Sequence, residues 1–270
     1  MKKLFLTLIL IFSCAVIGLT YHIYSNQDEL IFRSHSLDKE HLFELDHPYE
    51  EIFLPTLENT HINGLWFHTE NSKGVVLFFH GRGKNLNFWA HRAYPFINRG
   101  YDVLIIDYRG FGKSAKGFDE SWILEDGETA YHFLLSHYQE KEIIIYGHSM
   151  GTSIATWVAS THNPLMLILE APFYSMIEAA SYTKPLIPEF LIRWMLKYHF
   201  RTDRWIGKVK APIYIFHGIP DNVIPYNQSQ KLYGEIKHDK KNEMIILPNA
   251  GHGDVYQDPL YIEKLDELLP

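Results

Sequence analysis

Residues 147–151 read Gly147-His148-Ser149-Met150-Gly151, the pattern G-x-S-x-G. The apolar run Ile143-Ile144-Ile145-Tyr146 precedes them, and a stretch of small residues with helical character, Thr152–Ala159, follows. This order of strand, tight turn and helix is the context in which the motif carries a nucleophilic serine. The glycines are needed because side chains at their positions would collide with the neighbouring strand or helix. We therefore expect Ser149 to be a nucleophile at the end of a buried strand.

A serine hydroxyl is a weak nucleophile at neutral pH and needs a base that is oriented by an acid. In enzymes with this turn the three groups follow along the chain as serine, acid and histidine. Asp221 lies in a loop directly after one apolar run, and His252 lies in a glycine-flanked loop after the next. Because parallel strands end at the same edge of a sheet, both side chains are expected beside Ser149. Glu170, which ends an earlier apolar run, is the alternative acid.

The negative charge that develops during attack on an acyl carbonyl must be stabilised by backbone N–H groups. One is expected from Met150, the residue after the nucleophile. The other is expected from the loop His80-Gly81-Arg82-Gly83, which follows the apolar run Val75–Phe79, and we assign it to Arg82. The Arg82 side chain is expected to be solvated, with contact to an anionic substrate group as the alternative. We expect His80 to position this loop rather than to act as a second base.

Apolar runs alternate with helical periodicity, which predicts a mostly parallel eight-stranded sheet with helices on both faces. The expected strands are Tyr49–Leu54, Thr60–His68, Val75–Phe79, Val103–Asp107, Ile143–Tyr146, Leu165–Glu170, Ile213–His217 and Met244–Leu247. The first two are expected to pair antiparallel. The expected helices are Phe88–Asn98, Glu125–Tyr138, Thr152–Ser160, Asn227–Glu235 and Pro259–Leu269. This organisation predicts a catalytic domain over residues 49–270, preceded by a connector over residues 28–48.

Residues 173–210 are too long for a simple crossover and are rich in apolar and aromatic side chains. Pro185 and Pro188 divide the segment into short pieces, which indicates a small helical cap over the site. Phe190 and Trp194 lie on one face of a predicted helix. We expect these two residues to bind an acyl chain; ordinary packing on the sheet is the alternative role for the same face.

Residues 1–27 are predicted to be a membrane anchor or signal segment. Two lysines precede residues 4–27, a stretch without Asp, Glu, Lys or Arg that is about long enough to cross a bilayer. The lysines should stay in the cytoplasm, which places the catalytic domain on the non-cytoplasmic side. An uncleaved signal anchor is favoured, because no clean small-x-small cleavage site follows the apolar run. A protein secreted after cleavage near Val16-Ile17-Gly18 and a lipoprotein modified at Cys14 are the alternatives.

Several motifs together resemble the α/β-hydrolase superfamily. They are His80-Gly81-Arg82-Gly83, Asp107-Tyr108-Arg109-Gly110-Phe111-Gly112-Lys113-Ser114, the turn around Ser149, His217-Gly218 with Asp221, and Gly251-His252. Within the superfamily the chain is most similar to membrane-anchored hydrolases that resemble serine aminopeptidases and eukaryotic protein depalmitoylases, and residues 26–32 also resemble that branch. The resemblance covers most of the chain from about Tyr49 onward and implies an α/β-hydrolase fold that needs no cofactor.

A serine at the turn, rather than aspartate or cysteine, favours acyl transfer to water. We expect a serine hydrolase that cleaves carboxylic esters or thioesters of a small-molecule or lipid-like acyl substrate through an acyl-enzyme. Ser149 would be the nucleophile, His252 the base and Asp221 the acid. A peptidase or amidase, an acyltransferase and a non-catalytic binding protein of the same fold remain alternatives.

Other functional classes have little support in the sequence. The net charge of −7 argues against a nucleic-acid partner. No His-Glu-x-x-His or paired-cysteine pattern occurs, so no metal site is expected. Gly112-Lys113-Ser114 resembles the end of a phosphate-binding P-loop, but Asp107 stands where that motif needs its first glycine. Cys14 is the single cysteine, which excludes an intramolecular disulfide. The sequence leaves the oligomeric state open.

Overall fold

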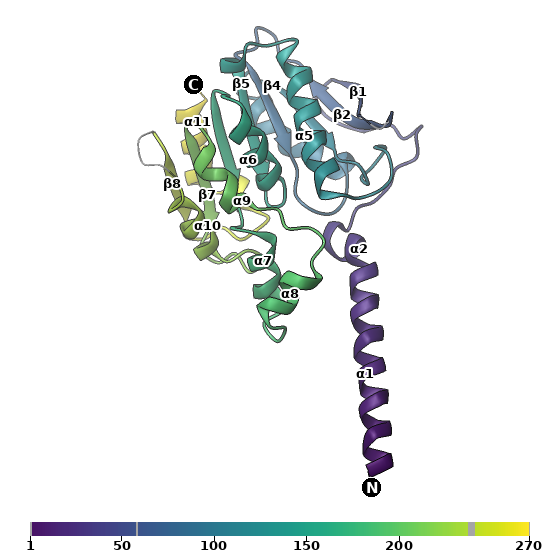
Figure 1. The fold of residues 1–270 in the computed structure, drawn as a ribbon. Helices are drawn as coiled ribbons and strands as arrows, with labels where there is room; N and C mark the ends of the chain where they lie inside the picture. The colour runs from purple at the N-terminus through teal and green to yellow at the C-terminus, as the bar shows by residue number, and fades with distance from the viewer. Residues whose placement is uncertain (1, 58, 237–240, 270) are drawn as a thin grey trace.

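A sheet of eight strands forms the body of the molecule, and a long helix extends from it (Figure 1). The computed structural model describes residues 2–57, 59–236 and 241–269. The strands are β1 (Tyr49–Pro55), β2 (His61–Phe67), β3 (Val75–Phe79), β4 (Asp102–Asp107), β5 (Ile143–His148), β6 (Met166–Glu170), β7 (Ile213–Gly218) and β8 (Glu243–Leu247). They lie in the order β1-β2-β4-β3-β5-β6-β7-β8. The pairs β1–β2 and β2–β4 are antiparallel and the others parallel, so the expected eight-stranded, mostly parallel sheet is confirmed.

The interior strand β3 shows why the sheet must be covered on both faces. Every one of its side chains is buried, as expected for a central parallel strand. Alternate residues, beginning with Val75, pack into the apolar core on one face, while Val76 and Phe78 pack into the core on the other. Because successive side chains of a strand point in opposite directions, β3 joins the two cores and fixes the loop that follows it.

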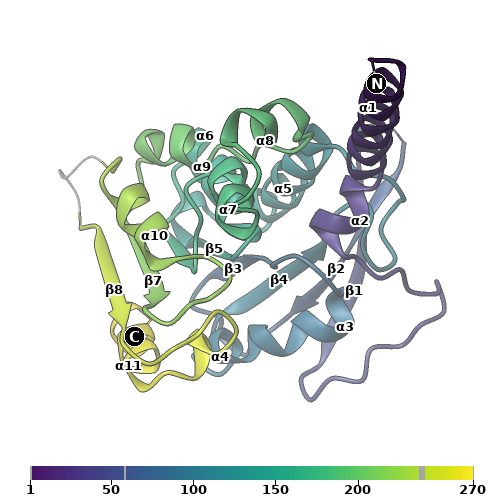
Figure 2. The same cartoon turned by 90° about the horizontal axis from the view of Figure 1, so that it is seen from below.

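Most of the helices in the described residues cover the two faces of the sheet, while α1 extends away from it (Figure 1). The helices are α1 (Lys2–Ser25), α2 (Gln27–Phe32), α3 (Leu86–Trp89), η1 (Ala90–Ala93), α4 (Tyr94–Ile97), α5 (Glu120–Leu135), η2 (Glu140–Glu142), α6 (Gly151–Thr161), α7 (Met176–Thr183), α8 (Glu189–Met195), α9 (Thr202–Trp205), η3 (Ile206–Lys208), α10 (Tyr226–Tyr233), η4 (Val255–Gln257) and α11 (Pro259–Leu268). Figure 2 shows α3, α4 and α11 on one face of the sheet, with α5, α6 and α10 on the other.

Two helices differ from the sequence prediction for local reasons. The helix expected over residues 88–98 is divided into α3, η1 and α4, and a proline that has no N–H to donate lies in the first turn of α4. The helix expected from Glu125 begins earlier, at Glu120. It does so because the Asp119 side chain accepts a hydrogen bond from the Ser121 N–H (2.8 Å) and caps the first turn.

The segment that follows α1 is packed against the domain that contains the sheet. Its short helix α2 ends at Phe32, whose side chain is fully buried and stacks on Phe118 with ring centroids 4.4 Å apart. Beyond α2 the chain pairs with Lys84 and Gly112 through backbone hydrogen bonds. The first part of the connector expected over residues 28–48 is therefore integrated into the domain.

Short helices replace a simple crossover between β6 and β7. Of these, α7 and α8 project from the same edge of the domain as α1 (Figure 1). Ile192 of α8 is buried, but Phe190 and Trp194, the residues expected to bind an acyl chain, are 69% and 74% exposed. Their side chains therefore neither pack on the sheet nor line an enclosed cavity.

Candidate active site

Ser149 occupies the tight turn between β5 and α6. Its backbone has a φ of 51°, in the left-handed region that non-glycine residues rarely adopt. A Cβ at Gly151 would lie 2.0 Å from the carbonyl oxygen of Phe79, and one at Gly147 would lie 2.6 Å from the carbonyl oxygen of Gly151. The Ser149 N–H donates to the Glu170 carbonyl (2.9 Å). The flanking glycines and this hydrogen bond hold the serine in a conformation that it would not otherwise maintain.

The structure brings the predicted nucleophile, base and acid together. His252 Nε2 lies 3.0 Å from Ser149 Oγ, and His252 Nδ1 lies 2.7 Å from Asp221 Oδ2. The three side chains come from the loops after β5, β8 and β7, all at the carboxyl edge of the sheet. The imidazole is 17% exposed and the Asp221 carboxylate is fully buried. This is the hydrogen-bond order in which a histidine can remove the serine proton.

The Asp221 carboxylate is held ionised by its surroundings. Its Oδ1 accepts the backbone N–H groups of Val223 and Ile224, each at 2.8 Å, and His217 Nε2 lies 3.2 Å from Oδ2. Burial alone would raise the pKa of Asp221, but hydrogen bonds from His217 and His252 hold it well below its usual range. A fixed negative charge therefore faces His252 Nδ1 and favours the tautomer whose Nε2 accepts a proton.

Glu170, the alternative acid, is buried and has other partners. Its carboxylate contacts Arg92, His148 Nδ1 (3.0 Å) and the Tyr146 hydroxyl. Burial opposes its ionisation, but the Arg92 charge and the His148 hydrogen bond hold the pKa of Glu170 well below its usual range. Because His252 Nδ1 bonds Asp221 instead, this geometry favours Asp221 over Glu170 as the orienting acid.

Sequence reasoning missed Arg92, which links Glu170 to the loop that carries the base. The Arg92 guanidinium donates to the Gly253 carbonyl (3.3 Å) and lies 3.7 Å from the centre of the Tyr256 ring. Since Gly253 follows His252 directly, the Glu170–Arg92 ion pair fixes the backbone of that loop. No sequence signal marks Arg92, because the residues it joins are distant along the chain.

The predicted oxyanion groups are available for a ligand. In the parts of the chain that the structure describes, the N–H groups of Met150 and Arg82 donate to no acceptor. The loop after β3 is nevertheless fixed, because the Gly83 N–H donates to the Phe32 carbonyl (2.7 Å) and the Gly83 carbonyl accepts Trp89 Nε1 (2.9 Å). The loop is therefore held while two N–H groups remain free for developing negative charge.

His80 also fixes the position of the loop after β3. The His80 ring is fully buried, with Nδ1 2.7 Å from the Gly81 carbonyl and Nε2 3.2 Å from Asp107 Oδ1. The Arg82 side chain is exposed. These contacts fit a positioning role for His80 and a solvated Arg82 side chain.

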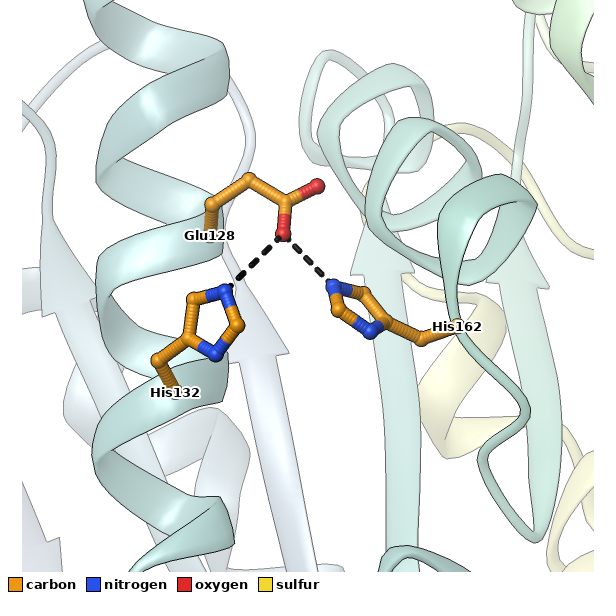
Figure 3. A group of neighbouring side chains, drawn as sticks. All are labelled: Glu128, His132 and His162. Atoms are coloured by element: carbon orange, nitrogen blue, oxygen red, sulfur yellow. Dashed lines mark hydrogen bonds and ion pairs between the residues drawn. The ribbon is translucent and has the colours of Figure 1, made fainter.

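One group of side chains has the composition of a metal site. Glu128 and His132 of α5 lie beside His162 at the end of α6, and their ligand atoms are within 4.8 Å of one another (Figure 3). Glu128 already accepts hydrogen bonds from His162 Nε2 (2.7 Å) and the Thr161 hydroxyl (3.0 Å), which ties α5 to α6. The length of α6, roughly 16 Å at 1.5 Å per residue, separates this group from Ser149, so it takes no part in chemistry there.

Comparison with known proteins identifies the family to which this chain belongs. Residues 70–204, half of the chain and the part that contains the Ser149 turn, match the family described as serine aminopeptidase S33. The chain belongs to this family of α/β-hydrolases. The uncharacterised protein Rv2307c of Mycobacterium tuberculosis is 27% identical to this α/β-hydrolase over 208 residues, which cover 76% of the chain and 72% of the relative.

Two further proteins that are similar to this α/β-hydrolase have named activities. The lysophosphatidylserine lipase ABHD12 of Danio rerio is 28% identical over 227 residues, covering 74% of this chain and 59% of the relative. The esterase Pf2001 of Pyrococcus furiosus superposes with a TM-score of 0.70 at 21% identity, covering 88% of this chain and 96% of that one. The second likeness concerns the fold alone. The chain is accordingly an α/β-hydrolase by family and by fold.

Proposed function

We propose that this α/β-hydrolase is a serine hydrolase that cleaves carboxylic esters or thioesters of lipid-like acyl groups. The observation that carries the proposal is the hydrogen-bonded series from Ser149 Oγ through the His252 ring to Asp221. An acid held ionised at one ring nitrogen leaves the other free to accept the serine proton. The lipase named among the similar proteins supports ester substrates.

The reaction proceeds in two halves. Ser149 Oγ attacks the acyl carbonyl carbon while its proton passes to His252 Nε2, and the oxyanion lies against the N–H groups of Met150 and Arg82. Collapse of this intermediate breaks the ester or thioester bond, and His252 gives its proton to the departing oxygen or sulfur. Water, deprotonated by His252, then attacks the acyl-enzyme, releases the acid and restores Ser149. Asp221 stabilises the imidazolium in both halves and stays ionised throughout.

Fluorophosphonate labelling of the full chain in detergent micelles tests the nucleophile. We expect one adduct, mapped to Ser149, that is lost in Ser149→Ala and His252→Ala. Ser136→Ala, which removes an exposed serine at the end of α5, should label like the wild type. Folded wild-type protein that takes no label would contradict the proposal and favour a non-catalytic protein of the same fold.

The family description makes a peptidase the second candidate. Turnover of p-nitrophenyl esters from acetate to octanoate, an S-acyl thioester series and aminoacyl p-nitroanilides distinguishes the classes. We expect turnover of esters and thioesters that exceeds turnover of anilides. Faster release of p-nitroaniline from the anilides would assign the chain to the peptidases, and acyl transfer to an added alcohol or amine in preference to water would make it an acyltransferase.

We also propose that α1 anchors the enzyme in a membrane with the catalytic domain on the non-cytoplasmic side. An 18-residue stretch within Lys3–Ser25 has a mean hydropathy of 2.4, and none of that stretch is buried in the protein. Alkaline extraction and N-terminal sequencing of membrane-bound protein test the anchor. Soluble protein that begins near residue 19 would instead show cleavage of a signal peptide and secretion.

A further inference from the structure

The most exposed apolar side chains of the catalytic domain include several gathered on α7, α8 and their connection. Leu186 is 96% exposed, Trp194 74%, Phe190 69% and Tyr182 50%. Phe190 and Trp194 are four residues apart in α8 and share one of its faces, while Leu186 lies in the connection before it. We call these four residues the cap tip. Soluble proteins rarely expose so many large apolar groups together unless the surface binds something.

The elements that carry the cap tip project from the domain in the same direction as α1. Figure 1 shows α8 and the connection before it beside the end of α1 nearest the domain, and Figure 2 shows both elements on the side facing the viewer. Since the span in α1 has the length and composition to cross a bilayer, α8 and the connection before it lie at the level where the helix would enter the membrane.

Hydrogen bonds fix the cap to the base of α1. Gln27, which is 5% exposed, donates through Nε2 to the Met195 carbonyl (2.7 Å) and accepts the Lys197 N–H through Oε1 (2.9 Å). Asp28 Oδ1 accepts the Tyr198 hydroxyl (2.7 Å). Met195 is the last residue of α8, so the helix that carries the exposed face is joined directly to the segment that follows α1. The orientation of one element therefore determines that of the other.

We propose that the cap tip inserts into the bilayer beside α1, so that a lipid-like substrate reaches Ser149 from the membrane. This inference rests on the proposed anchor. The occupant is lipid because the surface has the composition of an interfacial segment: Trp194 is a side chain enriched at membrane interfaces, and the exposed Lys184 and Arg193 lie among the apolar residues. Arg193 also pairs with the exposed Glu189 one turn earlier (2.9 Å). The Lys184 ammonium group would meet phosphate headgroups while the apolar residues enter the acyl region.

Depth-dependent fluorescence quenching tests the insertion. Because Cys14 is the only native cysteine, replacing it leaves an introduced cysteine as the single labelling site. The full chain carries Cys14→Ser together with Leu186→Cys or Phe190→Cys, and each thiol is labelled with an environment-sensitive fluorophore. The labelled proteins are reconstituted in phosphatidylcholine vesicles that contain nitroxide-labelled lipids. We expect blue-shifted emission and quenching by shallow nitroxides at both positions. The control Lys141→Cys, an exposed residue that precedes β5 at the opposite edge of the sheet, should be neither shifted nor quenched.

A probe on native Cys14 separates the two proposals. If the Cys14 probe is quenched by deep nitroxides but the probes at 186 and 190 are not, α1 spans the bilayer and the cap tip does not enter it. That result would overturn the insertion. If the Cys14 probe is also unquenched, α1 does not span the bilayer, and both the proposed anchor and the proposed insertion are wrong.

Activity provides a second, independent measurement. Leu186→Asp should leave hydrolysis of soluble p-nitrophenyl butyrate unchanged but lower hydrolysis of a lipid ester embedded in vesicles by about tenfold, because a charged side chain opposes insertion. The matched control Lys141→Asp should change neither rate. Equal rates for Leu186→Asp and wild type on the vesicle substrate would show that the cap tip is not the route of entry.

Discussion

At the scale of single residues, two carboxylates at the ends of neighbouring strands have different partners. Asp221 bonds the His252 ring, whereas Glu170 bonds Arg92 and His148 and supports the loop that carries His252. Both are buried and both are held ionised, so burial and charge alone do not tell them apart. Their hydrogen-bond partners do, and this difference leads to opposite expectations for the two amide variants.

Asp221→Asn should lower kcat for p-nitrophenyl butyrate by about 10³–10⁴, because the amide cannot hold the required tautomer or stabilise the imidazolium. Glu170→Gln should reduce kcat far less but lower the free energy of unfolding by about 3 kcal/mol, since Arg92 then lacks its buried partner. Steady-state kinetics and urea unfolding of both variants check the pair. The reverse ranking of kcat would make Glu170 the orienting acid.

His148 gives a pH dependence of stability. Burial lowers the pKa of His148 to about 4 from 6.5, and the adjacent Glu170 only partly offsets this. As pH falls through 6.5 the unfolded chain binds a proton at this histidine while the folded chain does not, so stability is lost between pH 6.5 and about 4. The total loss is about 3 kcal/mol.

His148→Gln should therefore flatten the dependence of unfolding free energy on pH within that window, whatever its effect on stability at neutral pH. Urea unfolding at half-unit steps of pH measures the slope. Parallel curves for variant and wild type would show that the histidine does not remain neutral in the folded protein.

At the scale of secondary-structure elements, the segment after α1 supports the loop after β3, which carries the proposed oxyanion N–H of Arg82. The Phe32 carbonyl accepts the Gly83 N–H, the Arg33 carbonyl accepts the Lys84 N–H (3.3 Å), and the next residues continue the pairing. Phe32 is also fully buried among aromatic rings. This segment is thus part of the framework of the candidate active site as well as a link to α1.

Two truncations test this role. A chain that begins at Asn26 should keep the turnover of p-nitrophenyl butyrate and the unfolding temperature of the full chain. One that begins at Asp38 should lose activity and unfold at a lower temperature, because removal of a buried phenylalanine costs about 3–5 kcal/mol. Phe32→Ala in the full chain should fall between the two. Equal activity of the two truncated chains would contradict a supporting role.

The features that could be predicted from the sequence are those that depend on residues close together along the chain. The Ser149 turn follows from its glycines and flanking strand, and the sheet follows from apolar runs separated by helical periodicity. Arg92 and the segment after α1 were not predictable, because they depend on contacts between residues far apart, 78 positions for Arg92–Glu170 and 50 for His35–Asn85. Periodicity placed Phe190 and Trp194 on one face but could not say whether that face meets the sheet, water or lipid.

At the scale of the whole molecule, the single cysteine lies outside the catalytic body. Cys14 is exposed on α1, and the sequence contains no other. Alkylation with N-ethylmaleimide should leave turnover of p-nitrophenyl butyrate unchanged, while a serine-directed sulfonyl fluoride should abolish it. Labelled protein that loses activity with maleimide would show that α1 influences the site directly.

The projection of α1 and α8 from the same edge of the domain also bears on which substrate concentration controls the rate. An enzyme whose entrance lies in the bilayer encounters substrate by lateral diffusion in two dimensions, so its rate follows the mole fraction of substrate among the lipids rather than the amount per volume of buffer. Adding inert phospholipid at constant total substrate would slow such an enzyme by surface dilution. Membrane composition would then regulate turnover without any effector binding to the protein.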